Sequence, residues 1–215
     1  MPGTLPVPTP LYRIVHFENV DYILNNGIYT RSHANHDPNY VNIGNTQLIA
    51  DRHDYPVKLN DYGNLGDYVP FYLGAHSPML YQIINGYGVK WVPQNEIIYF
   101  ITNAQKIAQQ GLKFVFTNGH AKKNITKFYN NLNDLEAVDW DVVSLKKWNN
   151  TQDDMDRMRR KQAEFLIHTH VPINLIDQIV VYNQEKFNFV DSLLKKIGLN
   201  IPSVFGLIGF FAVLV

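Results

Sequence analysis

Short apolar segments alternate irregularly with helical segments of unequal length, and this spacing constrains the fold more than any other feature of the chain. The apolar segments have the length of buried strands, and Gly, Asn or Pro residues interrupt the chain between them. A regular βαβ array would need similar helices between successive strands, so the pattern predicts a mixed α+β domain. Strands are expected at residues 12–16, 68–73, 97–101, 113–117, 163–167 and 178–182.

Capping residues indicate where the helices begin and end. Asn19 is expected to cap a short helix that Gly27 ends, and Ser77 precedes a proline at a helix start. Thr102 is expected to cap a helix that runs to Gly111. Acidic residues after Thr151 and basic ones near Lys161 match the dipole of a single helix. Further helices are expected at 46–53 and 185–197.

The composition predicts one domain without an overall attraction to polyanions. The 215 residues carry 19 basic and 19 acidic side chains, so a nucleic-acid site must come from local patches. The absence of cysteine excludes disulfides and thiolate metal sites and fits a reducing cytoplasm, where we expect the protein. The first residues lack the pattern of a signal peptide, and the apolar stretch 203–215 is too short to span a bilayer, so no membrane association is expected.

A single glutamate, Glu164, stands where a basic run gives way to an apolar strand. The run 157–161 is rich in arginine and lysine, and Ala163 and Phe165 flank the glutamate. A carboxylate in this position loses hydration on folding, so it needs a partner or a chemical task. Two interpretations stay open. Glu164 could close a helix as a structural ion pair, or it could act on a phosphate-bearing substrate that the cations attract.

A long polar segment, 31–67, is rich in Asn, Asp, His, Gly and Tyr. A polar segment of this length inside a compact domain is typical of a functional loop. Arg52 lies in its second half, at the end of the expected helix 46–53. An arginine in such a position is commonly a surface residue, so Arg52 alone indicates little.

Two further segments could line a ligand site, although each also fits a plain core. On the first strand Arg13 faces one side of the sheet and His16 the other, where it could be a core histidine. Free N–H groups at the helix start after Ser77 could hold a phosphate, while Met79 and Tyr81 could stack on a base or a nicotinamide ring.

No known nucleotide-binding, hydrolase or zinc-protease motif is present. His33 and His36, and likewise His168 and His170, have spacings that could chelate a metal, but carboxylates at useful spacing are not evident. We therefore expect no metal site.

Several motifs resemble, in their order along the chain, the DarT family of DNA ADP-ribosyltransferase toxins. The resemblance covers about residues 8–183. Two departures are a valine, Val15, where family members often carry threonine, and a C-terminal stretch after about residue 200 that does not look like the family's usual ending. The motifs are Leu11-Tyr-Arg-Ile-Val-His16 with Asn19, Arg52, Tyr68-Val-Pro-Phe-Tyr, Ser77-Pro-Met-Leu-Tyr81, Phe114-Val-Phe-Thr117 with His120, and Lys161-Gln-Ala-Glu-Phe-Leu166.

The resemblance implies an α+β, ADP-ribosyltransferase-like fold: a split mixed β-sheet with surrounding helices and a central NAD cleft. It also implies sequence-specific transfer of ADP-ribose from NAD to a base in single-stranded DNA. The acceptor would be thymine, at N3, in the better-matching branch of the family and guanine in another. A macrodomain antitoxin of the DarG type is the implied partner, and a monomer is expected.

The resemblance further assigns roles to single residues. Glu164 and Arg52 would be catalytic, with Glu164 stabilising the oxocarbenium-like transition state and taking the thymine proton. Arg52 would orient Glu164 and bind the NAD pyrophosphate. The NAD contacts would come from Arg13, His16, Asn19, Gly27, Arg52, Ser77 and Met79. The DNA contacts would come from Met79, Tyr81, His120, Lys122, Lys123, Trp148, Arg157, Arg159 and Arg160.

Two alternatives remain at the level of sequence. The same fold could modify guanine, RNA, protein or a free nucleotide, because a fold does not fix its acceptor. The chain could also be a non-catalytic nucleic-acid-binding module in which Glu164 is only a structural partner of Arg52.

Overall fold

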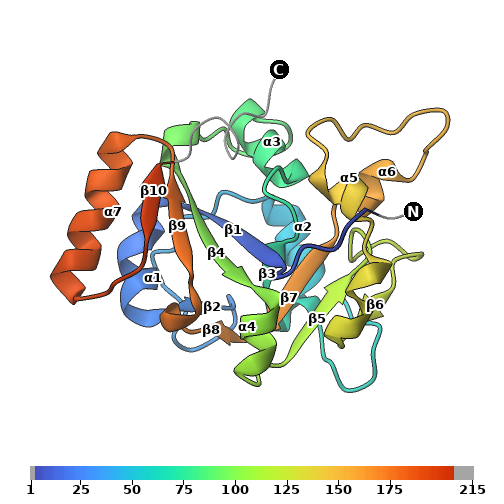
Figure 1. The fold of residues 1–215 in the computed structure, drawn as a ribbon, viewed down its shortest axis with the longest axis horizontal. Helices are drawn as coiled ribbons and strands as arrows, with labels where there is room; N and C mark the ends of the chain where they lie inside the picture. Colours follow the sequence, from blue (N-terminus) through green and yellow to red (C-terminus); the bar gives the residue numbers. More distant parts are fainter. Residues whose placement is uncertain (1–2, 206–215) are drawn as a thin grey trace.

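A computed structural model describes residues 3–205 of the chain (Figure 1). The strands in this part follow most of the apolar segments expected from the sequence. They are β1 (Pro10–His16), β2 (Ile28–Tyr29), β3 (Tyr68–Tyr72), β4 (Ile97–Asn103), β5 (Phe114–Thr117), β6 (Phe128–Tyr129), β7 (Glu164–His168), β8 (His170–Val171), β9 (Gln178–Val181) and β10 (Ser203–Phe205).

The helices differ widely in length. The α-helices are α1 (Val20–Asn26), α2 (Thr46–His53), α3 (Pro78–Asn85), α4 (Ala104–Gln109), α5 (Trp140–Ser144), α6 (Arg157–Arg160) and α7 (Gln184–Ile197). Short 3₁₀ helices lie at Phe17–Asn19, Leu65–Asp67, Gln94–Glu96, Leu132–Ala137 and Ile173–Leu175.

Within residues 3–205, eight strands form one sheet in the order β10-β9-β4-β1-β3-β7-β5-β6, and β2 pairs with β8 separately. The pairings of the large sheet are antiparallel except for the parallel pair of β10 with β9. These eight strands thus form one large mixed sheet, and helices of unequal length surround it (Figure 1). The α+β fold class predicted from the irregular spacing is confirmed.

The two faces of the sheet carry different cores. One large apolar cluster includes buried residues of α1, α4 and α7, so these helices cover one face. On the other face α3 covers one cluster, and the loop around Val57 and Leu65 covers a second, which includes Leu166 of β7. Arg52 meets β7 on this second face, where the site described below lies.

The structure corrects three details of the helix predictions. Asn19 stands at the start of α1, but its side chain bonds the backbone of Val41 instead of capping the helix. Asn103, not Thr102, caps α4: its side chain accepts from the N–H of Lys106, whereas the hydroxyl of Thr102 donates to the carbonyl of Leu175. The helix expected from 151 to 161 is only the single turn α6, and Asp154 and Asp156 before it form ion pairs with its arginines.

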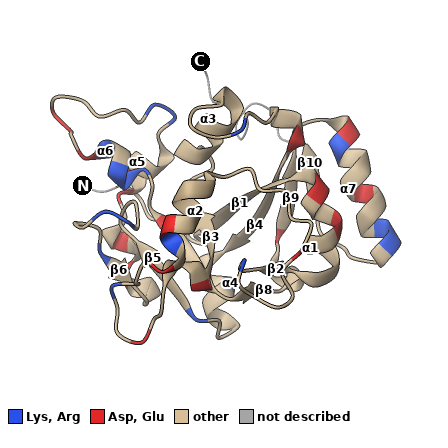
Figure 2. Cartoon of the chain, turned by 180° about the vertical axis from the view of Figure 1, so that it is seen from behind, with Lys and Arg blue, Asp and Glu red and all other residues tan. Residues whose placement is uncertain are grey.

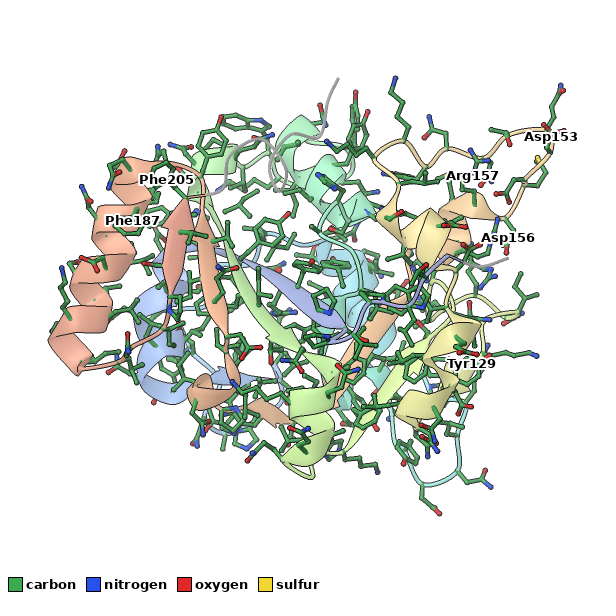
Figure 3. All side chains as sticks on the ribbon, in the orientation of Figure 1. Tyr129, Asp153, Asp156, Arg157, Phe187 and Phe205 are labelled. Atoms are coloured by element: carbon green, nitrogen blue, oxygen red, sulfur yellow. The ribbon has the colours of Figure 1, made fainter. Side chains whose placement is uncertain are left out.

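The last described strand, β10, lies at the left edge of the sheet in Figure 3. Phe205 of β10 meets Phe187 of α7 edge to face, with ring centroids 6.2 Å apart. Of the apolar stretch 203–215, only this short strand falls within the described residues; the remainder lies outside them.

Replacing Phe165 tests the core that lies behind the site. Its side chain is fully buried and stacks on Phe114 with ring centroids 4.9 Å apart. We expect Phe165→Ala to lower the free energy of unfolding by about 3–5 kcal/mol, because it removes a large buried ring and leaves a cavity. Urea denaturation measures this.

Met155→Ala is the control, because Met155 is 72% exposed, and it should change the free energy of unfolding by less than about 0.5 kcal/mol. Equal effects of the two substitutions would contradict the position of Phe165 in the core.

Candidate active site

Glu164 opens β7 close to the point where the two halves of the sheet meet. In the described residues, β1 and β3 pair at one register position, Tyr12 opposite Tyr72. Tyr72 in turn lies opposite Glu164. Directly opposed residues on neighbouring strands share a face, so Tyr12, Tyr72 and Glu164 form a row across the sheet. Because β1 and β3 pair at this position alone within residues 3–205, the sheet is split between them. The split mixed sheet expected from the family resemblance is confirmed.

Arg52 of α2 forms a bidentate ion pair with Glu164. Its two terminal nitrogens donate to Oε1 at 3.0 Å and to Oε2 at 2.7 Å. The arginine and glutamate side chains are only 16% and 8% exposed. Two charges this buried depend on each other, since either one alone would be strongly unfavourable. Glu164 therefore has an ion-pair partner, but the pair joins segments 112 residues apart and does not close a helix as the structural interpretation had expected.

Two neighbours on β5 and the loop after it fix the glutamate further. The backbone N–H of Ala121 donates to Oε1 of Glu164 at 3.3 Å. The backbone N–H of Glu164 donates to the hydroxyl of Thr117 at 3.2 Å, and that hydroxyl donates to the carbonyl of Gly119 at 2.7 Å. The carboxylate is thus held in one orientation from both sides.

The protonation of the neighbouring groups follows from burial and from the charges of the pair. Burial, reinforced by the charge of Glu164, raises the pKa of Tyr72 to about 12, so its hydroxyl is neutral. Burial lowers the pKa of His120, and the charge of Glu164 only partly opposes this. Burial alone would lower the pKa of Arg52, but the charge and hydrogen bonds of Glu164 outweigh it and raise that pKa. At neutral pH the tyrosine and the histidine beside the pair are therefore neutral.

Arg13 lies at the split itself. One terminal nitrogen donates to the carbonyl of Pro70 on β3 at 2.9 Å, and the other reaches the hydroxyl of Tyr40 at 3.5 Å. Its Nε is buried and has no hydrogen-bond partner in the described part of the chain. A buried, unsatisfied guanidinium nitrogen is unusual and fits a site that an anionic or oxygen-rich ligand completes.

His16 and Asn19, the next two predicted NAD residues, hold protein segments. His16 is 7% exposed, and its Nε2 lies 3.0 Å from a carboxylate oxygen of Glu96. Asn19 makes two bonds of 2.9 and 2.8 Å with the backbone of Val41, which ties the long polar segment to β1. NAD contacts of these two residues stay a prediction.

The remaining predicted NAD residues lie at different distances from the row. Gly27 ends α1 with a φ of +84°, and a Cβ there would come within 2.5 Å of the His170 ring, so its glycine is required by local packing. Ser77 caps α3 by accepting from Leu80 N–H, and it also bonds Tyr72. Met79 packs beside the cluster under α3. The structure brings Ser77 to the row, whereas the NAD contact of Gly27 stays a prediction.

The expected DNA-side residues of the loop after β5 lie close to the ion pair. His120 lines an open depression of about 670 Å³, together with Lys123, Met158 and Arg159. Lys122 forms an ion pair of 2.8 Å with Asp51, the residue before Arg52. This loop and α2 are therefore linked twice, by the Asp51 pair and by the shared contact with Glu164.

The arginines of α6 are not free cations. Arg157 pairs with Asp154 at 3.1 Å and Arg159 with Asp156 at 2.6 Å. Figure 2 marks the alternating charges of this region, and Figure 3 labels Asp156 and Arg157 beside α6. Arg160 likewise pairs with Asp139, Asp154 and Asp156. DNA contacts of the three arginines stay a prediction, but their charges are already compensated.

Tyr81 and Trp148 come together from distant segments. Tyr81 lies on α3 and Trp148 in the loop after α5, and their rings meet edge to face with centroids 5.9 Å apart. Both had been expected on the DNA side for separate reasons. Their direct contact joins α3 to the chain that leads to Glu164.

Sequence reasoning missed three residues that support the pair, Tyr72, Thr117 and Asp51, and it misread a fourth nearby in the chain, Lys161. The first two follow from strand register, which the sequence does not reveal, although both stood in quoted motifs. Asp51 was visible only as a neighbour of Arg52. Lys161 was interpreted as part of a basic run, but it is 4% exposed, and its Nζ donates to the carbonyls of Val143 and Leu145 at the end of α5.

The described residues contain no group of three or more His, Asp or Glu side chains placed to hold a metal ion. Residues 3–205 also contain no helix that is long and apolar enough to cross a membrane.

The split mixed sheet with its surrounding helices has the fold of an ADP-ribosyltransferase. The family described as "ssDNA thymidine ADP-ribosyltransferase, DarT" matches residues 12–207. The chain belongs to the DarT family.

Similar proteins carry related descriptions. A DNA ADP-ribosyl transferase of Escherichia coli O127:H6 is 39% identical over 181 residues, which cover 84% of this chain and 83% of the relative. The structure of Thermus sp. 2.9 DarT in complex with ADP-ribosylated ssDNA has a TM-score of 0.88 at 30% identity and covers 96% of this chain and 98% of its own. Thermus sp. 2.9 DarT in complex with NAD+ has a TM-score of 0.80 at 30% identity, with 94% and 98% covered.

The coupling of Arg52 and Glu164 can be measured by a double-mutant cycle. We expect Arg52→Met and Glu164→Leu each to lower the free energy of unfolding by about 3–5 kcal/mol, because each leaves the other charge buried and unpaired. The double variant should lose less than the sum of the two, since no lone charge remains. Urea denaturation of the four proteins gives the coupling. Additive losses would contradict the buried pair.

Lys161 should make stability depend on pH in the alkaline range. Burial lowers its pKa to about 8 from the ordinary value of 10.5. Between these values the unfolded chain binds a proton that the folded chain does not, so the free energy of unfolding should rise with pH; below about 8 both states are protonated and this dependence ends. The gain is up to about 3 kcal/mol, at about 1.4 kcal/mol per pKa unit.

Lys161→Met should lack this rise, while Lys195→Met, whose side chain is 76% exposed, should keep it. The measurement is urea denaturation of the three proteins from pH 8 upward. A difference between wild type and Lys161→Met that does not change with pH would contradict the lowered pKa.

Proposed function

We propose that this chain transfers ADP-ribose from NAD to a thymine base in single-stranded DNA. The observation that carries the proposal is the buried pair of Arg52 and Glu164 at the split of the sheet. Its context is the family relation to Thermus sp. 2.9 DarT, which has been seen with NAD+ and with ADP-ribosylated ssDNA.

NAD would lie along the split between β1 and β3. Arg13 supports this position, because its buried Nε is unsatisfied in the described residues and can donate to an oxygen of NAD. Asn19 would act by fixing the polar segment at Val41, so that Tyr40 closes over Arg13. Arg52 keeps donors beyond the two that Glu164 uses, and these can reach a pyrophosphate oxygen.

The reaction exchanges one C–N bond for another at the anomeric carbon of the NAD ribose. The bond to nicotinamide breaks and nicotinamide leaves as a neutral molecule, while thymine N3 forms the new bond and loses its proton. Positive charge builds on the ribose as the first bond breaks. Glu164, held as a carboxylate by Arg52, would stabilise that charge and accept the N3 proton directly or through water.

The neighbours of the pair support this division of roles. Tyr72 is neutral, lies next to Glu164 in the row and bonds Ser77, so it can position substrate without adding charge. His120 has a lowered pKa and faces the open depression, which suits a neutral hydrogen-bonding group at the DNA side. Lys122, Lys123, Met79, Tyr81 and Trp148 would complete the DNA side, as the family resemblance implies.

The biological setting is part of the proposal. The chain would act as a cytoplasmic, monomeric toxin, and a macrodomain antitoxin of the DarG type would remove the modification. The absence of cysteine fits a reducing compartment. Transfer to guanine, to RNA or to protein is the competing outcome of the experiment below.

Reaction of short single-stranded oligonucleotides with NAD, followed by mass spectrometry, tests the proposal. We expect the mass of one ADP-ribose to appear on oligonucleotides that contain thymine and to vanish when every thymine is replaced. Glu164→Gln should lower kcat by about 100- to 1,000-fold, as the loss of an electrostatic stabiliser does. Expression of the wild type should arrest growth, and expression of Glu164→Gln should be tolerated.

Glu136→Gln is the matched control, because Glu136 is exposed and should leave transfer unchanged. Circular dichroism must show that Glu164→Gln is folded at the assay temperature. Label on protein or RNA with none on DNA would reject the proposed acceptor. A folded Glu164→Gln with full activity would reject the catalytic role of the glutamate.

A further inference from the structure

A cluster of partly exposed aromatic rings extends along α3 and the loop after it. Tyr81 contacts Tyr87, with ring centroids 5.7 Å apart, and Trp148 edge to face at 5.9 Å. Tyr87 and Trp91 are 57% and 59% exposed, which is unusual for such large rings. These four residues, Tyr81, Tyr87, Trp91 and Trp148, are called the aromatic ledge.

The backbone holds the ledge rigidly. Gly86 ends α3 in a left-handed conformation with a φ of +69°, and the N–H of Tyr87 donates back to the carbonyl of Gln82 at 2.9 Å. The N–H of Val92 donates to the carbonyl of Ile83 at 3.2 Å, so the loop folds back onto the helix. A rigid ring loses little entropy when a flat partner stacks on it.

Unpaired positive charge lies next to the ledge. Lys146 and Lys147 directly precede Trp148 in the chain, and both are exposed. Neither forms an ion pair or a side-chain hydrogen bond with the described residues. This distinguishes them from Arg157 and Arg159, whose charges are compensated by aspartates.

Two contacts tie the ledge to the elements that build the active site. Ser77 caps α3 and bonds Tyr72 of the row. Asn45, which caps α2, donates to the carbonyl of Gly88 in the ledge loop at 3.2 Å. α3 spans about 12 Å, at about 1.5 Å per residue. The ledge therefore begins beside the site and leads away from it.

We propose that the aromatic ledge is a stacking subsite for unpaired bases that flank the target nucleotide, with Lys146 and Lys147 contacting the phosphates. Exposed aromatic rings beside free cations are the combination that binds single strands, because every unpaired base offers a face and every nucleotide a phosphate. A duplex keeps its base faces stacked internally, so the ledge selects single strands. This inference rests on the proposed function for the identity of the target strand.

Binding by long and short oligonucleotides tests the ledge. Labelled strands of about five and about fifteen nucleotides, each with one thymine among deoxyadenosines, cover a short and an extended site. Fluorescence anisotropy gives Kd for the wild type, Tyr87→Ala and Trp91→Ala. Transfer to the same strands and KM for NAD are measured in parallel. Phe205→Ala is the control, because Phe205 is 47% exposed on β10 at the far edge of the sheet.

We expect each ledge variant to raise Kd for the long strand about 10-fold, the loss of one base–ring stack, and to change Kd for the short strand little. KM for NAD should stay at the wild-type value in the ledge variants. The control Phe205→Ala should keep the wild-type Kd for both strands. An abasic site at the stacked nucleotide should weaken binding by the wild type. The same abasic site should cost the Tyr87→Ala or Trp91→Ala variant nothing more, because the stack is already lost.

Equal losses for short and long strands, additive losses at every abasic position, or a raised KM for NAD would each overturn the ledge. Ring-dependent binding by a wild type that transfers nothing to DNA would support the ledge and reject the proposed function. If the wild type transfers ADP-ribose to DNA but Tyr87→Ala and Trp91→Ala bind the strands with the wild-type Kd, the proposed function is supported and the ledge is overturned.

Discussion

The position of α2 depends on the buried ion pair between Arg52 and Glu164. No apolar residue of this helix is fully buried, so apolar packing contributes little to its position. Its contacts are polar: the bidentate pair with Glu164, the pair of Asp51 with Lys122, and the bond from Asn45 to the loop after α3. A buried charge without its partner is strongly unfavourable. The pair therefore folds the polar segment onto the sheet and orients the carboxylate in the same step.

The split in the sheet gives that pair its surroundings. Because β1 and β3 share one register position in the described residues, part of the backbone of β3 lacks a strand partner there. Arg13 satisfies one of these groups, the carbonyl of Pro70, and keeps its own Nε unsatisfied. Buried polar groups require partners. An ordinary continuous sheet would leave no place for a polar ligand between its strands, whereas this one leaves donors that are only partly used.

The sequence revealed the elements better than the contacts between them. Apolar runs located the strands, and Gly27 marked the end of α1 correctly, because both signals are local. The strands β2, β6 and β8 were missed, since two residues carry no periodicity. The partner of Glu164 could be named only through the family resemblance, because nothing local connects positions 112 apart. Lys161 was misread because burial of its amine depends on carbonyls contributed by another segment.

The ion pairs of α6 show why the basic run 157–161 overstated the positive charge available to DNA. Asp139 lies far before the run and Asp154 just before it, and both compensate Arg160. With net charge zero and this run neutralised, the attraction of the protein for nucleic acid has to come from a few unpaired lysines and from exposed rings. Few phosphate contacts mean a shallow dependence on salt and weak binding to duplex DNA. Weak phosphate binding combined with stacking suits an enzyme that acts on a base. Only an unpaired, accessible base can stack on the exposed rings.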